Sequence, residues 1–150
     1  MKLIFSALCE HAEVRPDGRL DVRGVFHDLY APGFPAKQDR MVLVLVVEWE
    51  RSDEGSYQFR ASLEDPDGKE MGRVEIDTDV RPTHPTLPPP RTKLVTPLQE
   101  VIFVRPGPHR FRVRIKGHDM EGPQVILFEQ PEGEDPDAGH RVPTEAPGRA

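Results

Sequence analysis

Residues 41–50 read Met-Val-Leu-Val-Leu-Val-Val-Glu-Trp-Glu and form the most apolar run in this chain of 150 residues. Four of the first seven are valine, a β-branched residue that favours strands. Residues 41–47 have no polar side chain on either face, which is typical of a strand that is covered on both sides. The stretch therefore predicts the central core strand of a β-sheet.

Two other segments alternate strictly between apolar and polar side chains. Residues 57–64 do so, and residues 109–116 place Phe111, Val113 and Ile115 on one face. A period of two predicts a strand with one buried and one exposed face. Shorter runs predict five further strands, at residues 3–9, 20–26, 71–77, 98–104 and 125–128.

Proline and glycine mark the connections between these strands. The Pro-Asp-Gly triplets at residues 16–18 and 66–68 are turn signals, and each predicts a hairpin. Residues 80–97 are rich in proline, which cannot donate a ladder hydrogen bond, so they predict a stiff crossing segment and not a strand. The same segment contains two P-x-x-P patterns, for which we favour the linker interpretation over a peptide ligand.

About eight strands, turns roughly every 8–12 residues and no ordinary helix predict an all-β, two-sheet antiparallel sandwich. The topology stays open between immunoglobulin-like, C2-like and jelly-roll arrangements. We expect one domain over residues 1–130. Residues 131–150 are rich in Pro, Gly, Asp and Glu and are predicted to be a disordered tail.

Composition narrows the functional classes. The 20 basic and 26 acidic residues give a net charge of −6, which argues against a general nucleic-acid binder. The single cysteine cannot form an internal disulfide, and no apolar run approaches the roughly 18 residues of a membrane span. The apolar start, residues 3–9, is too short for an export signal. We therefore expect a cytoplasmic protein with neither nucleic acid nor membrane as a partner.

The order of these features is familiar. A first strand at residues 3–10, the Asp17-Gly18 turn and a second strand ending in Gly24-Val25-Phe26 precede a proline-containing loop at residues 31–35. With the later turn and strand at residues 106–116, the chain resembles a family of short bacterial proteins catalogued only as a domain of unknown function. The resemblance implies a cytosolic β-sandwich over roughly residues 1–130, with no known catalytic residue.

The residues offer no persuasive catalytic or metal-binding pattern. None of the serines lies in a Gly-x-Ser-x-Gly turn. Cys9 and His11 share a strand face, but an apolar strand beside Glu10 disfavours a reactive thiolate. A metal site would have to be assembled without any standard spacing from Cys9, Glu10, His11, Glu13, His27 and Asp28. We therefore expect no catalytic residue, metal or cofactor.

The acidic loops leave a calcium site as an alternative. Residues 65–68, residues 77–79 and Asp119 are the candidates, because some sandwiches gather such loops at one end. The same residues are also ordinary turn formers, which is the interpretation we favour.

A basic row is the one candidate contact surface with a defined chemistry. Arg110, Arg112, Arg114 and Lys116 fall on one face of a single strand, about 6.6–6.8 Å apart. Such a row suits an anionic partner, or cross-strand pairing with acidic neighbours. The acidic residues of the tail also offer it an internal partner, through Glu132, Glu134, Asp135 and Asp137.

The sequence therefore defines a fold class but no activity. The favoured hypothesis is a non-catalytic, cytosolic module that binds an unknown protein partner. The alternative is a domain that binds a small ligand or calcium. Self-association through an edge strand stays open, and the edge is expected to flank the proline-rich segment.

Overall fold

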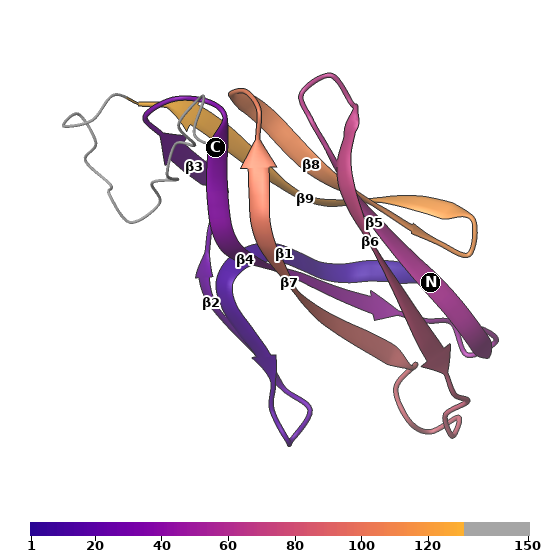
Figure 1. The fold of residues 1–150 in the computed structure, drawn as a ribbon. Coiled ribbons are helices and arrows are strands. Elements are labelled where there is room, and N and C mark those ends of the chain that lie inside the picture. Colours follow the sequence, from indigo (N-terminus) through magenta and orange to yellow (C-terminus); the bar gives the residue numbers. More distant parts are fainter. Residues whose placement is uncertain (131–150) are drawn as a thin grey trace.

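The computed structural model of the chain describes residues 1–130, which form nine strands in two sheets (Figure 1). The strands are β1 (Lys2–Val14), β2 (Leu20–Val25), β3 (Asp28–Ala31), β4 (Ala36–Glu48), β5 (Gly55–Glu64), β6 (Glu70–Val80), β7 (Arg91–Phe103), β8 (Gly107–Ile115) and β9 (His118–Glu129). The tail and its four acidic residues, Glu132, Glu134, Asp135 and Asp137, lie outside the described residues.

The strands run in the order β2-β1-β4-β7 in one sheet and β3-β9-β8-β5-β6 in the other. The all-β, two-sheet architecture is confirmed, and β4 lies between two neighbours as the apolar run predicts. Every pairing is antiparallel except that of β3 with β9, which is parallel. The expected eight strands become nine because β3 has only four residues, too few to show a period of two.

The core lies between the sheets. Met41, Leu43, Leu45 and Val47 of β4 are buried against the inward face of the second sheet. That face is built from the alternating strands β5 and β8, with Phe59, Ala61, Leu63, Phe111, Val113 and Ile115 buried. Both alternations therefore have the predicted faces.

A bulge in β1 reverses part of the expected pattern. The pairing with β4 shifts between Leu3 and Phe5, so that Leu3 lies opposite Val47 while Phe5 lies opposite Val46. The extra residue, Ile4, moves every later side chain to the other face of the sheet. Uninterrupted alternation predicts that Leu3 shares a face with Phe5, Ala7 and Cys9. Because of the bulge, Leu3 lies on the opposite face from these three residues.

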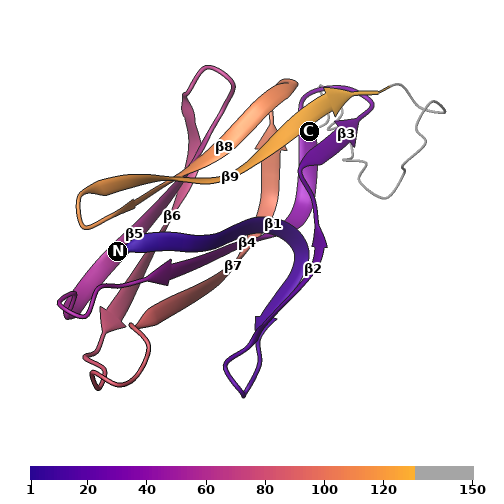
Figure 2. The same cartoon turned by 180° about the vertical axis from the view of Figure 1, so that it is seen from behind.

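The second half of β1 explains why residues 41–47 have no polar residue. Beyond Cys9, β1 leaves β4 and pairs only with β2, and Figure 2 shows it bending into this hairpin. Ala12, Leu20 and Val22 of the hairpin pack over the outward-facing Val42 and Val44. At the tip, Lys93 Nζ donates a hydrogen bond to the Gly18 carbonyl oxygen over 2.7 Å. β4 is thus covered on both faces.

The predicted crossing segment, residues 80–97, is wrong in its extent. β7 begins at Arg91 and includes Pro97, which lies opposite Val42. β7 is an edge strand, where proline is tolerated because only one side needs ladder hydrogen bonds. Residues 81–90 alone make the connection, with a turn closed by the Leu87 N–H and the His84 carbonyl. The two strands that flank this connection, β6 and β7, are both edges, whereas the sequence led us to expect one edge there.

The connection between β8 and β9 is also short. β8 ends at Ile115 and β9 begins at His118, so only Lys116 and Gly117 connect them. Gly117 has a φ of 74°, a conformation that glycine adopts without strain. Within residues 1–130 there is no helix long and apolar enough to cross a lipid bilayer.

Candidate functional site

One concave feature is a cleft between the two edge strands on one side of the sandwich. β6 and β7 converge at their shared connection and diverge toward the β5–β6 hairpin (Figures 1 and 2). In the wider part lies a cavity of about 440 Å³, which we call the β6–β7 cleft. It is lined by Pro97, Leu98, Gln99, Glu100, Val101 and Ile102 of β7, by Met71, Gly72, Arg73 and Val74 of β6, and by Ala61, Leu63 and Phe111.

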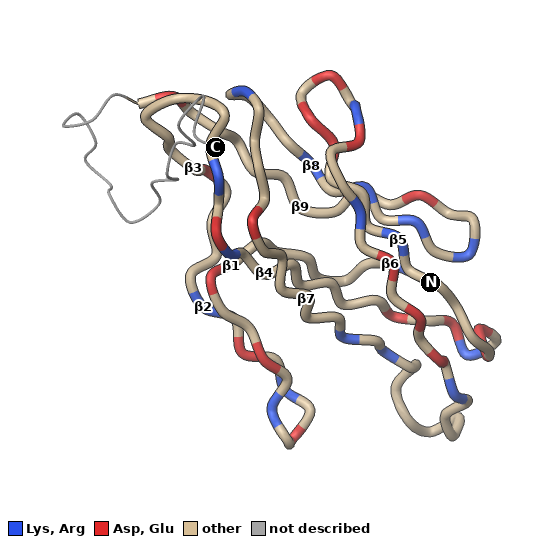
Figure 3. Tube along the Cα trace, viewed as in Figure 1, with Lys and Arg blue, Asp and Glu red and all other residues tan. Residues whose placement is uncertain are grey.

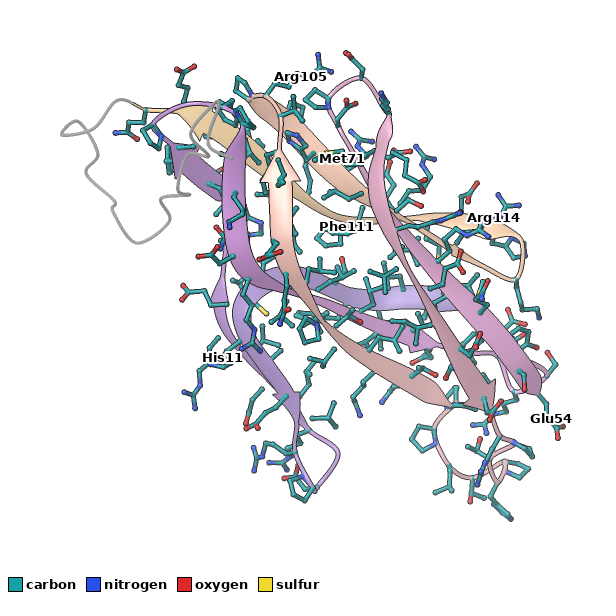
Figure 4. All side chains as sticks on the ribbon, in the orientation of Figure 1. His11, Glu54, Met71, Arg105, Phe111 and Arg114 are labelled. Atoms are coloured by element: carbon teal, nitrogen blue, oxygen red, sulfur yellow. The ribbon has the colours of Figure 1, made fainter. Side chains whose placement is uncertain are left out.

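The floor of the β6–β7 cleft is apolar. Ala61, Leu63 and Phe111 are buried members of the core. Met71 and Leu98 are half-buried and pack against that core. Figure 4 shows the Met71 and Phe111 side chains in the space between β7 and β5. The cleft is therefore an extension of the hydrophobic core that stays open to solvent.

Gly72 contributes no side chain to the β6 wall of the cleft. It pairs with the buried Leu63, so a side chain at position 72 would point to the same inner face. A Cβ atom built at Gly72 meets no atom within 4 Å. Glycine inside a strand weakens it, and commonly marks a place where a ligand or another backbone approaches.

The opposite wall is irregular at Glu100. This residue has a φ of 54°, in the left-handed region that residues other than Gly, Asn and Asp rarely adopt. Its neighbours Gln99 and Val101 pair with Arg40 and Gln38 of β4, while Glu100 lies between these two pairs. Backbone strain of this kind clusters at functional sites. The β7 wall of the cleft therefore departs from regular strand geometry at Glu100.

The basic row has a different environment from the cleft. Arg110, Arg112 and Arg114 are exposed on the outer face of β8, as predicted. Each has a carboxylate from a neighbouring strand or turn: Arg110 lies 3.7 Å from Glu121, Arg112 3.4 Å from Glu64 and Arg114 3.5 Å from Asp119. Figure 3 shows basic positions on β8 and acidic positions on neighbouring segments. The cross-strand interpretation of the row is therefore the one that the geometry favours.

Lys116 does not extend this row. It occupies the β8–β9 turn with a φ of 53°, and its Nζ donates a hydrogen bond to the Asp53 carboxylate. The ammonium also lies 5.3 Å from the centre of the Tyr57 ring. The Asp53 hydrogen bond raises the pKa of Lys116, and the same bond lowers the pKa of Asp53. Alternation alone predicted Lys116 as the last residue of the strand, whereas β8 ends at Ile115 and Lys116 lies in the turn.

Cys9 and His11 do not form a reactive pair. Cys9 is fully buried beneath the β1–β2 hairpin, whereas His11 is exposed on it. Burial raises the pKa of the Cys9 thiol. Thiolate formation is therefore disfavoured at the one position where a cysteine nucleophile was considered.

Within residues 1–130, no three His, Cys, Asp or Glu side chains are placed to hold a metal ion. The group Cys9, Glu10, His11, Glu13, His27 and Asp28 does not converge on one point. The acidic loops are also separated: Asp65 and Asp67 lie at the β5–β6 hairpin, Asp77 and Asp79 lie near the other end of β6, and Asp119 is in β9. Arg105 contacts both carboxylates of the hairpin.

One unusual side chain escaped the sequence analysis. His109 has no exposed surface, and its ring lies edge-on to Phe103 at 5.0 Å between centres. Its Nδ1–H donates to the Gly107 carbonyl oxygen over 2.9 Å, while Nε2 has no hydrogen-bond partner in the described part of the chain. Burial lowers the pKa of His109. The alternation of β8 does predict an inward side chain at position 109.

Comparison with known proteins adds a family but no activity. No curated protein matches the sequence. The sequence model of a family of unknown function, DUF6941, matches residues 4–125, which include nearly all of the sandwich. The chain therefore belongs to the DUF6941 family, whose function is unknown.

Proposed function

We propose that the protein is a non-catalytic binding module and that the β6–β7 cleft receives an apolar segment of a protein partner. The observation that carries the proposal is the open cavity above the buried Phe111 and Leu63. Binding sites are typically concave and mostly apolar, with volumes of about 300–1,000 Å³. The polar side chains that line this cleft are Arg73, Gln99 and Glu100, so Glu100 has no Ser, Cys, His or second carboxylate beside it in the lining to form a catalytic pair.

The shape of the cleft favours an elongated occupant. Six consecutive residues of β7, 97–102, line it, which corresponds to a length of roughly 20 Å. A small ligand is usually enclosed by its pocket, whereas an extended chain suits an open groove between strands. We also propose a cytoplasmic location, which the single, buried thiol of Cys9 supports.

The cleft is tested with an apolar fluorophore, N-phenylnaphthylamine, titrated into the full chain. We expect saturable binding to the wild type and a loss of at least about tenfold in affinity for Gly72→Phe, since each 1.4 kcal/mol of lost contact is tenfold. Gln124→Phe, an exposed position on β9, is the matched control and should bind as the wild type does. Equal binding by Gly72→Phe, or none by the wild type, would overturn the proposal.

The partner is then sought by affinity capture from host extract with wild type and Gly72→Phe in parallel. We expect at least one protein that the wild type retains at high salt and that Gly72→Phe loses. High salt removes contacts between exposed charges but not apolar ones. Identical captured sets from the two proteins would assign binding to another surface.

A further inference from the structure

We propose that the occupant is an extended strand that pairs with the free edge of β6 and alternates apolar with basic side chains. This proposal rests on the proposed function of the β6–β7 cleft. From Gly72 to Val80, β6 pairs in unbroken register with β5 on one side only. Its other side is an edge, which is a template for an added strand.

The edge of β7 is a poorer template. Pro97 has no backbone N–H to offer, and Glu100 interrupts the extended conformation. Both residues lie within the part of β7 that lines the cleft. An added strand is therefore expected on the β6 side.

The inner face of β6 indicates which side chains the added strand carries on its own inner face. Val74, Ile76 and Thr78 are half-buried, and Gly72 leaves the space above Leu63 open. Side chains of a strand paired to β6 alternate between the inner and the outer face. Those on the inner face lie over the apolar cleft near Gly72 and Val74, and beside the half-buried Ile76 further along, so they are expected to be apolar.

The outer face of β6 indicates which side chains the added strand carries on its own outer face. Glu75, Asp77 and Asp79 are exposed there, and Figure 3 shows acidic positions along the strand. Glu75 is balanced by Arg60 at 3.4 Å and by Arg73 at 3.7 Å. Asp77 and Asp79 accept hydrogen bonds only from Gln58 and Ser56, and neither has a basic partner within residues 1–130. Opposite charges across a strand pair are favourable, so basic side chains are expected at these levels.

The same carboxylates disfavour a second copy as the occupant in the register that is centred on Asp77. Two β6 edges paired antiparallel about Asp77 would place Asp77 opposite Asp77 and Asp79 opposite Glu75. Like charges directly opposite each other are destabilising. A strand from a different protein, carrying Lys or Arg, avoids this conflict.

The test uses two fluorescent peptides of about nine residues, long enough to follow residues 72–80 in extended form. One alternates Val with Lys and the other alternates Val with Glu, and binding is measured by fluorescence polarisation. We expect the Val/Lys peptide to bind the wild type at least about tenfold more tightly. The double variant Asp77→Asn/Asp79→Asn should lose about 2- to 30-fold in affinity for the Val/Lys peptide, the range for two exposed cross-strand pairs. Asp119→Asn, which changes an acid on β9, is the control and should leave this affinity unchanged.

Backbone pairing is tested separately by N-methylation of alternate residues of the Val/Lys peptide. Methylating the set that faces β6 should abolish binding, and methylating the other set should not. Equal tolerance of the two sets would overturn strand pairing, and equal affinity for the two peptides would overturn the basic pattern. Either result leaves the cleft itself intact when N-phenylnaphthylamine still binds, whereas failure of the fluorophore to bind overturns the proposed function. A dimer in sedimentation velocity that Gly72→Phe abolishes would assign the cleft to a second copy and overturn this proposal.

Discussion

Leu63 and Gly72 lie directly opposite each other across the β5–β6 pair, and only Leu63 has a side chain to bury. A Cβ atom at Gly72 would meet nothing within 4 Å, and the backbone there is outside the left-handed region. Glycine in a strand interior is destabilising by about 0.5–1 kcal/mol relative to alanine. We therefore expect Gly72→Ala to raise the free energy of unfolding by about that amount, measured by urea denaturation.

Gly122 of β9 provides the matched control for this prediction. A Cβ atom there would lie 2.9 Å from the Phe111 carbonyl oxygen and 3.0 Å from Phe111 Cβ. Because backbone must move to admit it, Gly122→Ala should lower stability by about 1–3 kcal/mol. A loss of stability in Gly72→Ala as large as that in Gly122→Ala would contradict the open space described at Gly72.

Most of the fold could be predicted from the alternation of apolar and polar residues along the sequence. Residues 57–64 and 109–115 have the faces that a period of two predicts, and residues 41–47 lie in a covered strand. The errors have local causes: Ile4 adds a bulge that no composition rule reveals, and Pro97 is permitted in β7 only because that strand is an edge. Edge position is a property of the whole sheet, so proline content alone misjudged where β7 begins.

The candidate site was less predictable than the fold. The β6–β7 cleft joins residues 71–74 to residues 97–102, and their proximity follows from sheet order rather than from any motif. The exposure of Arg110, Arg112 and Arg114 was visible in the sequence. Their carboxylate partners could be identified only from the register in which β8 pairs with β5 and β9, and these partners are Glu64, Asp119 and Glu121. The row's binding of an anionic partner stays a prediction.

The strained backbone at Glu100 makes a further prediction. A left-handed conformation costs a residue with a side chain roughly 1–2 kcal/mol, and glycine avoids this cost. We expect Glu100→Gly to keep or slightly raise stability, and Glu100→Val to lower it by about 1–2 kcal/mol, since β-branched residues fit this region worst. Thermal unfolding of the two variants measures the difference. The reverse order of stability would show that position 100 is extended in solution.

The buried Asp53 predicts a loss of stability in acid. Its carboxylate accepts hydrogen bonds from Lys116 Nζ and, over 3.0 Å, from the Glu50 backbone N–H. These bonds lower its pKa below the ordinary 3.8, so the unfolded chain takes up a proton at a higher pH than the folded one. The stabilisation is complete above about pH 4 and is lost as the pH falls through the lower, folded pKa.

The measurement is thermal unfolding of wild type and Asp53→Asn over the acid range. Asn cannot titrate, so the variant should be less stable at neutral pH and should lose less stability on acidification. Glu54→Gln, an exposed neighbour, is the control and should follow the wild type. Parallel curves for wild type and Asp53→Asn would remove Asp53 from the explanation.

His109 acts in a separate pH window. Burial lowers its pKa below the ordinary 6.5, with a smaller lowering from Arg105, while the Gly107 carbonyl and Asp65 act in the opposite direction. As the pH falls below about 6.5, the unfolded chain therefore binds a proton before the folded chain does. Stability is complete above that pH and declines below it, by at most about 1.4 kcal/mol per pH unit for one group.

His109→Phe keeps an aromatic ring against Phe103 and removes the titration, so its urea midpoint should change less than that of the wild type between about pH 7 and pH 5. His84→Phe, a change in the exposed 81–90 connection, should retain the full slope of the wild type. If His109→Phe retains that slope as well, the pH dependence in this window arises from another group.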